Sequence, residues 1–142
     1  MTRFTVSADR TAMDVAVIHH YLSERSYWAR GIAYDKVVKS LDNALCFGGF
    51  VDGAQVAFAR VVTDRATFAY LCDVFVLEAH PRKGYSKALM AAIMDHADLQ
   101  DLRRFYLGTL DAHSLYAQFG FKPIARPERL MEINNLIISE RS

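Results

Sequence analysis

Three strand-like runs follow one another in the middle of the chain, and they restrict the fold more than any other feature. The stretch CFGGFVDGAQVAFARVVT, residues 46–63, is divided by Asp52 and Gly53, a pair typical of a two-residue hairpin turn. After a second turn at residues 63–66, FAYLCDVFVLEAH is apolar on both of its sides, as a central strand is. We therefore predict three consecutive antiparallel strands.

Helical patterns lie on both sides of these strands. Apolar residues recur at helical spacing from Asp14 onward, and further helices are predicted at residues 35–41, 85–96 and 111–119. In the clearest of them, 85–96, Leu89, Ile93 and Ala92 are expected to face inward. Shorter strands are predicted at residues 3–6, 103–110, 121–125 and 130–133.

The predicted order is therefore strand, two helices, three strands, helix, strand, helix and one or two closing strands. This order describes a mixed α/β (α+β) fold, with a largely antiparallel sheet flanked by helices. The length of 142 residues suits one domain over residues 1–142.

The composition excludes several classes of protein. The net charge of +1 without any block of like charge speaks against a broad nucleic-acid surface. No apolar run reaches the length of a membrane helix, and MTRFTVSADR lacks the apolar core of a signal peptide, so we expect a cytoplasmic protein. Cys46 and Cys72 are expected to be buried free thiols. The five histidines show no metal-ligand spacing, so no metal site is predicted.

The stretch HPRKGYSKALM, residues 80–90, places positive charge and a glycine at the start of a helix. Unpaired N–H groups and the helix dipole suit an anion at such a position, and Gly84 leaves its approach open. The spacing matches neither the nucleotide P-loop nor the three-glycine dinucleotide fingerprint. A solvated basic loop that merely begins a helix is the alternative.

A second motif, GTLDAHSLYAQFGF, spans residues 108–121. Tyr116 falls on a short helix after a strand, and Asp111 has the place of an N-cap. Taken alone, Tyr116 would be a core aromatic residue.

Together, the two motifs and the order of elements resemble the GNAT superfamily of acyl-CoA-dependent N-acetyltransferases. In the first motif the family pattern falls on Pro81, Gly84 and Ser86, and only Gly84 agrees with it. The second motif matches at Ala112, Leu115, Tyr116, Gly120 and Phe121, while Thr109 replaces a frequent asparagine.

The resemblance implies that acetyl-CoA is the acyl donor and assigns it a set of residues. The pyrophosphate would be held by main-chain amides over residues 82–87, and the thioester and pantetheine arm would lie along the central strand. The implied coenzyme residues are Val74, Phe75, Val76, Arg82, Lys83, Gly84, Tyr85, Ser86, Lys87 and Thr109.

The same resemblance makes Tyr116 the acid that protonates the leaving thiolate. Asp73 interrupts an apolar strand, and it is either the base that takes a proton from the substrate ammonium or a structural acceptor for Arg60 or for a backbone group. His113 is a second candidate for the base or for contact with the acceptor. Tyr27, Trp28 and Tyr34 either stack on an amine-bearing acceptor or pack the first helices on the sheet.

The function implied is transfer of an acetyl group to a primary amine of a small molecule or peptide, by direct attack in a ternary complex. A non-catalytic acyl-CoA-binding or regulatory domain is the alternative. A toxin that acetylates aminoacyl-tRNA would need a basic groove, which the even spread of charge does not suggest. Edge strands in such a sheet often pair between subunits, which leaves a homodimer open.

Overall fold

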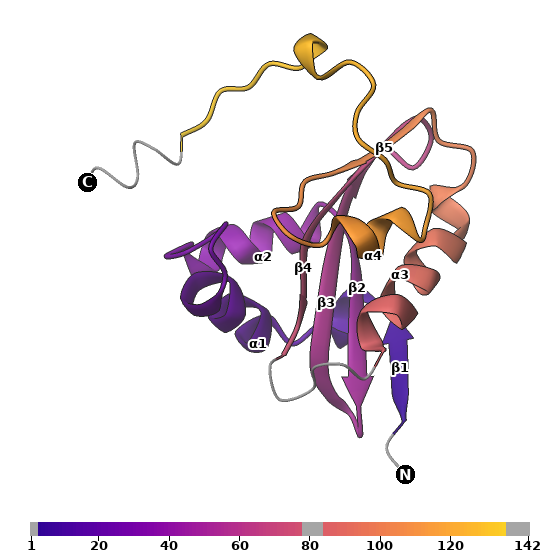
Figure 1. Ribbon diagram of the computed structural model, residues 1–142. Coiled ribbons are helices and arrows are strands. Elements are labelled where there is room, and N and C mark those ends of the chain that lie inside the picture. Colours follow the sequence, from indigo (N-terminus) through magenta and orange to yellow (C-terminus); the bar gives the residue numbers. More distant parts are fainter. Residues whose placement is uncertain (1–2, 78–83, 136–142) are drawn as a thin grey trace.

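The computed structural model describes residues 3–77 and 84–135, and a five-stranded sheet forms its centre (Figure 1). The strands are β1 (Phe4–Ser7), β2 (Leu45–Val51), β3 (Ala54–Thr63), β4 (Phe68–Val76) and β5 (Arg104–Leu107), and they lie side by side in that order. The first four are antiparallel, whereas β5 runs parallel to β4. The predicted fold class is confirmed.

The predicted hairpin joins β2 to β3. Asp52 and Gly53 have φ angles of 52° and 83°, and positive φ at both turn positions is what a two-residue hairpin with the twist of its strands requires. Val51 therefore pairs directly with Ala54.

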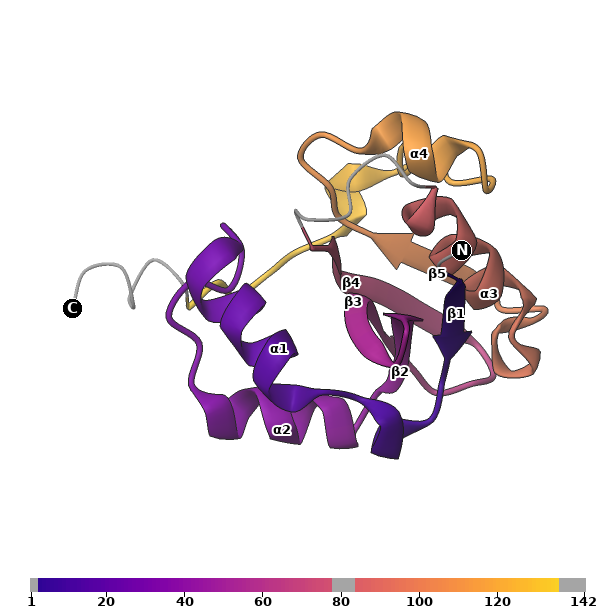
Figure 2. The same ribbon diagram turned by 90° about the horizontal axis from the view of Figure 1, so that it is seen from below.

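Helices cover both faces of the sheet (Figure 2). One face carries α1 (Val15–His20), a π-helical turn (Tyr21–Arg25) and α2 (Tyr34–Asp42); the other carries α3 (Tyr85–Asp95) and α4 (His113–Ala117). Short 3-10 turns lie at Arg10–Ala12, Ala97–Leu99 and Pro127–Arg129. The Asp14 carboxylate accepts a hydrogen bond from the Val17 N–H and caps α1. None of the helices in the described ranges is long and apolar enough to cross a membrane.

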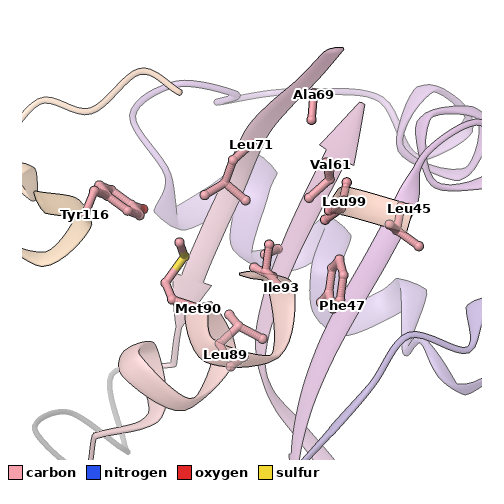
Figure 3. Packing of buried hydrophobic residues seen from close by; sticks show 12 residues of the cluster. Leu45, Phe47, Val61, Ala69, Leu71, Leu89, Met90, Ile93, Leu99 and Tyr116 are labelled. Carbon is pink, nitrogen blue, oxygen red and sulfur yellow. The ribbon is translucent and has the colours of Figure 1, made fainter. Parts of the chain in front are cut away.

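The face under α3 holds the larger part of the core (Figure 3). Leu89 and Ile93 are fully buried against β2, β3 and β4, as their spacing predicts. Met90 is also fully buried and contributes the third inward side chain of α3, while Ala92 is only partly covered. Met90, rather than Ala92, is thus the third side chain of α3 that faces the core.

The closing strands predicted at residues 121–125 and 130–133 do not form. A strand exists only when its backbone is paired, and Pro123 and Pro127 remove donors from this segment. The sheet therefore ends at β5. The predicted helix 111–119 is also shorter, because α4 spans His113–Ala117 only.

An aromatic stack joins the first strand to the start of α3. The rings of Phe4 and Tyr85 lie 4.2 Å apart and are nearly parallel, at 8°. Phe4 reaches this place because Gly49 on β2 has no side chain: a Cβ at Gly49 would lie 2.3 Å from the Phe4 ring. Residue 49 must therefore be glycine for the stack to form as it does.

Candidate functional site

The two parallel strands β4 and β5 part from each other halfway along β4. β5 pairs with Phe68–Leu71, whereas β4 continues to Val76 without a partner on that side among the described residues. On the other side of β4, Phe58 of β3 pairs with Phe75, and Arg60 pairs with Cys72. One residue of β3, Ala59, therefore lies opposite two residues of β4, Asp73 and Val74. This is a β-bulge, and Asp73 takes a left-handed conformation in it (φ 57°).

Main-chain donors point into the opening that results. The Leu77 N–H donates to the Val56 carbonyl at 2.8 Å, so residue 77 faces β3. Because successive residues of a strand point to opposite sides, the N–H groups of Val74 and Val76 face away from β3 and toward the opening. They are placed to donate hydrogen bonds to a ligand that lies beside β4.

A cavity of about 220 Å³ occupies the opening. It brings together six residues predicted for the site: Tyr27, Trp28, Asp73, Val74, Thr109 and Tyr116. Tyr70, Cys72 and Asp111 also line it, although they were not predicted. Strand alternation would place Cys72 and Val74 on one face and Asp73 on the other, so it gives no sign that the bulge brings all three residues to one cavity.

Asp73 is held at both carboxylate oxygens. One oxygen accepts a hydrogen bond from the Trp28 indole N–H at 2.8 Å, and the other pairs with the Arg60 Nε at 2.8 Å. The side chains of Asp73 and Arg60 are only 11% and 20% exposed. The carboxylate therefore fixes Trp28 at the wall of the cavity and pairs with Arg60, which supports the structural role left open by the sequence.

Tyr116 projects from α4 toward β4, near Leu71 and Met90 (Figure 3). Its side chain is only 7% exposed, and burial raises the pKa of the phenol, assisted by the nearby Tyr27 and Asp111. The following motif residues hold α4 in place, because the Phe121 N–H donates to the Tyr116 carbonyl. Among residues 3–77 and 84–135, no side chain or main-chain group forms a hydrogen bond with this phenol.

The start of α3 provides a second group of donors. Gly84 is the N-cap residue, with φ 75°, and the first helical hydrogen bond within the described range runs from the Ala88 N–H to the Gly84 carbonyl. The N–H groups of Ser86 and Lys87 have no hydrogen-bond partner in the described part of the chain. Tyr85 stacks on Phe4, so only its main chain can face a ligand. Pro81, Arg82 and Lys83 lie outside the described residues.

Other predicted residues lie outside the small cavity. His113 is exposed and lines a different, larger cleft beside α4. Tyr34 is exposed at the start of α2, with its ring edge against His19. Phe75 is buried on the face under α1 and stacks on Tyr21, so its side chain packs while only its main chain borders β3. Val76 packs on the core under α3.

The N-cap predicted at Asp111 is wrong. The residue that precedes α4 is Ala112, and its N–H donates a hydrogen bond to the Thr109 hydroxyl oxygen at 3.0 Å. Thr109 thus replaces the carboxylate as the local acceptor. Asp111 is free to project its charge at the mouth of the cavity, where it contributes to the raised pKa of Tyr116.

Cys46 and Cys72 are both free thiols; Cys46 is buried as predicted, whereas Cys72 is only partly buried. Burial raises the pKa of Cys46 to about 11 and that of Cys72 to about 12. Within the described ranges, no group of three or more His, Cys, Asp or Glu side chains could hold a metal ion.

Comparison with known proteins places this geometry in a family. The family model described as "Acetyltransferase (GNAT) family" matches residues 15–121. A protein of Gibberella zeae assigned as an acetyltransferase is 30% identical over 137 residues, which cover 81% of this chain and 76% of the relative.

Solved structures agree. A Xanthomonas campestris protein assigned to the GNAT family as an acetyltransferase is 56% identical, with a TM-score of 0.91 and 93% of each chain covered. A Clostridium acetobutylicum protein solved with acetyl-CoA shares the fold, with a TM-score of 0.68 at 11% identity over 96% of this chain and 98% of that one. The chain therefore belongs to the GNAT family of acetyltransferases.

Proposed function

We propose that the protein transfers the acetyl group of acetyl-CoA to a primary amine of a small molecule or peptide. The observation that carries this proposal is the opening between β4 and β5. There Val74, whose N–H group faces away from β3, and Tyr116, whose phenol has no hydrogen-bond partner among the described residues, line the same cavity, and the N–H group of Val76 faces the same side of β4. The main-chain N–H groups can stabilise the thioester carbonyl and the oxyanion that forms from it, and the phenol can protonate the leaving thiolate.

The donor would lie with its diphosphate at the start of α3 and its pantetheine arm along β4. The N–H groups of Ser86 and Lys87 and the bare backbone of Gly84 suit a diphosphate there. The positive charge of Lys87 lies beside them, and the sequence adds Arg82 and Lys83. The Clostridium acetobutylicum structure, solved with acetyl-CoA, supports acetyl-CoA as the donor by its shared fold.

The chemistry proposed is direct attack of the neutral amine on the thioester carbonyl. The carbon–nitrogen bond forms, the carbon–sulfur bond breaks, and Tyr116 gives its proton to the thiolate of coenzyme A. The proton that the nitrogen loses as the amide forms restores the phenol, directly or through water. A covalent acyl-enzyme through Cys72 is disfavoured, because burial raises the pKa of this thiol to about 12 and the thiolate is the nucleophilic form. The single thiol in the cavity thus does not compete with the acceptor amine.

The acceptor would enter beside Tyr27 and Asp111. Tyr27 is 62% exposed, Trp28 is fixed by Asp73, and Asp111 adds a negative charge at the mouth. Aromatic faces and a carboxylate favour a cationic amine. Each oxygen of Asp73 keeps a lone pair after its present bond, so Asp73 can still take the ammonium proton through a water molecule.

One observation favours the non-catalytic alternative, an acyl-CoA-binding domain with the same fold. Both oxygens of the proposed base are already bonded to the protein. Such a domain would bind acetyl-CoA and release no coenzyme A in the presence of any amine.

Calorimetry with acetyl-CoA, followed by a thiol-release assay, tests the proposal. We expect binding in the micromolar to low millimolar range, and release of coenzyme A with at least one compound from a panel of amines, amino acids, polyamines and peptides. Absence of binding at millimolar acetyl-CoA would contradict both candidate functions. Binding without turnover across the panel would favour the non-catalytic one.

Substituting Gly84 by valine is expected to weaken acetyl-CoA binding at least about tenfold. A β-branched residue at φ 75° costs about 1–2 kcal/mol, and it would also displace the main chain that meets the diphosphate. The measurement is the dissociation constant from calorimetry.

Gly53→Val is the matched control. Gly53 also has a positive φ (83°) and also has open space where a Cβ would be, but it lies in the β2–β3 turn. It should destabilise the fold similarly and leave the dissociation constant unchanged. Equal effects of both variants on binding would show that the start of α3 does not hold the donor.

A further inference from the structure

The cavity beside β4 offers negative charge and no positive charge to an acceptor. Two of the described side chains that line it, Asp73 and Asp111, are carboxylates, and none of them is a lysine, arginine or histidine. Tyr70, Cys72 and Tyr116 stay neutral at pH 7, because burial raises the pKa of each. A carboxylate brought into this space would therefore find no cation among the described residues that line it.

The two carboxylates of the cavity are not equivalent. Asp73 lies 2.8 Å from the Nε of Arg60, so the guanidinium largely offsets its negative charge. Asp111 is exposed, and its side chain forms no ion pair or hydrogen bond within residues 3–77 and 84–135. Its field nevertheless reaches the interior, where it helps to raise the pKa of Tyr116. Asp111 is thus the uncompensated charge of the cavity.

Aromatic rings form much of the remaining wall. Tyr27 is 62% exposed and Tyr70 40% exposed, and both line the cavity. The rings of Tyr27 and Trp28 meet edge to face at 86°, with their centroids 5.1 Å apart. The face of an aromatic ring attracts a cation and repels an anion. The rings and Asp111 therefore favour the same kind of acceptor.

The rings and the carboxylate come from opposite faces of the sheet (Figure 2). Tyr27 follows the π-helical turn on the face of α1, whereas Asp111 lies two residues before α4 on the other face. Both line the cavity together with residues 107–109, at and after the end of β5. An acceptor that enters between Tyr27 and Asp111 is thus in contact with both features.

We propose that this cavity selects amines that carry no carboxylate beside the reacting nitrogen, and that Asp111 excludes α-amino acids. The inference rests on the proposed acetyl transfer and names the class of its acceptor: amines with an aromatic or a second cationic tail. In an α-amino acid the carboxylate sits on the carbon that carries the amine, so it must enter with the amine. It would lose water among the rings and approach Asp111 without a cation to pair with. Together these effects should lower kcat/KM about a hundredfold.

Two pairs of acceptors that differ only in the carboxylate test the inference: 2-phenylethylamine with phenylalanine, and agmatine with arginine. The assay measures thiol release with saturating acetyl-CoA at low ionic strength, where the charge of Asp111 is least screened. In each pair kcat/KM should be about a hundredfold higher for the amine. A ratio near one in either pair overturns the inference.

Phenylalaninamide separates charge from size, because it keeps the bulk of phenylalanine and lacks its negative charge. Its kcat/KM should lie within about tenfold of the value for 2-phenylethylamine. Equal rejection of phenylalanine and its amide would show that the cavity excludes bulk, and it would overturn the argument from charge.

Asp111→Asn should lower the ratio of kcat/KM values in each pair at least about fivefold. The ratio is the readout because any effect of Asp111 through Tyr116 is common to both acceptors and cancels. Asp52→Asn is the matched control: Asp52 is also exposed, asparagine before Gly53 suits the same turn, and the hairpin lies outside the cavity. It should leave the ratio unchanged. An unchanged ratio in Asp111→Asn would overturn the role of Asp111.

Calorimetry on the protein saturated with coenzyme A measures binding of the same acceptors without the reaction. 2-Phenylethylamine and agmatine should bind at least about tenfold more tightly than phenylalanine and arginine. Equal dissociation constants within the pairs, or no binding of either amine at 10 mM, overturn this inference and leave the proposed transfer standing if thiol is released. Selective binding without thiol release from any amine supports the selection by the cavity and contradicts the transfer.

Discussion

Replacing Tyr116 by phenylalanine is expected to lower kcat about 10²- to 10⁴-fold, the usual contribution of a positioned general acid. The variant removes the proton donor and keeps the ring that packs against the core under α3. Acetyl-CoA binding should therefore stay nearly unchanged, because the lost interaction forms only as the thiolate leaves. Thiol release gives kcat, and calorimetry gives the dissociation constant.

Tyr70→Phe is the matched control for this prediction. Tyr70 lines the same cavity and its pKa is also raised by burial, but it lies on β4 and has no proposed role in the reaction. Its substitution should leave kcat within about threefold, the range of a minor packing change. If Tyr116→Phe kept a comparable kcat, Tyr116 would not be the acid.

A pH profile adds a second readout on the same residue. Burial raises the pKa of Tyr116 above its usual value of 10, so the phenol keeps its proton throughout the neutral and mildly alkaline range. Loss of activity due to its ionisation is therefore expected only above pH 10, and this loss should be absent in Tyr116→Phe.

Asp73→Asn is expected to lower the free energy of unfolding by about 2–4 kcal/mol. The change leaves the Arg60 guanidinium, which is largely covered, without its counter-charge, and such removal of one partner is costly. Asparagine tolerates the left-handed conformation of residue 73 as aspartate does, so the backbone should not add to the cost. Urea denaturation measures the difference.

Asp42→Asn provides the comparison. The Arg10–Asp42 pair has a similar length of 2.9 Å, but its side chains are 36% and 54% exposed, so its loss should cost about 0–1 kcal/mol. Equal destabilisation by the two variants would contradict the account of a buried pair.

The activity of Asp73→Asn tests the role of Asp73 as the base. It is measured at a lower temperature, where the variant stays folded. A kcat below that of the unaltered chain under these conditions supports the base.

Most of the fold could be predicted because local signals agree with the tertiary structure. Asp52 and Gly53 determine the hairpin, and the spacing of Leu89 and Ile93 determines the inner face of α3. The closing strands could not be predicted from their own residues. The predicted strands 121–125 and 130–133 each contain strand-forming apolar residues, yet Pro123 lacks a donor and a strand depends on a partner that the same segment does not supply.

The site was predictable in its parts rather than in its assembly. The motif around Tyr116 and the glycine at position 84 are short stretches of sequence, so their likeness to a family pattern is enough to identify them. The bulge at Asp73 depends on the pairing of β3 with β4, which no local pattern reveals. Asp111 was assigned to the helix start because an acidic residue before a helix usually caps it, but Thr109 is the residue that bonds the Ala112 N–H.

The ring of Phe4 links the outermost strand to the first turn of α3, and it can do so only while position 49 lacks a side chain. A methyl group there would push the ring aside and shift Tyr85, which lies between Gly84 and the Ser86 amide of the proposed diphosphate site. Natural variation at the far border of the sheet could thus retune donor affinity without altering any atom that meets the coenzyme.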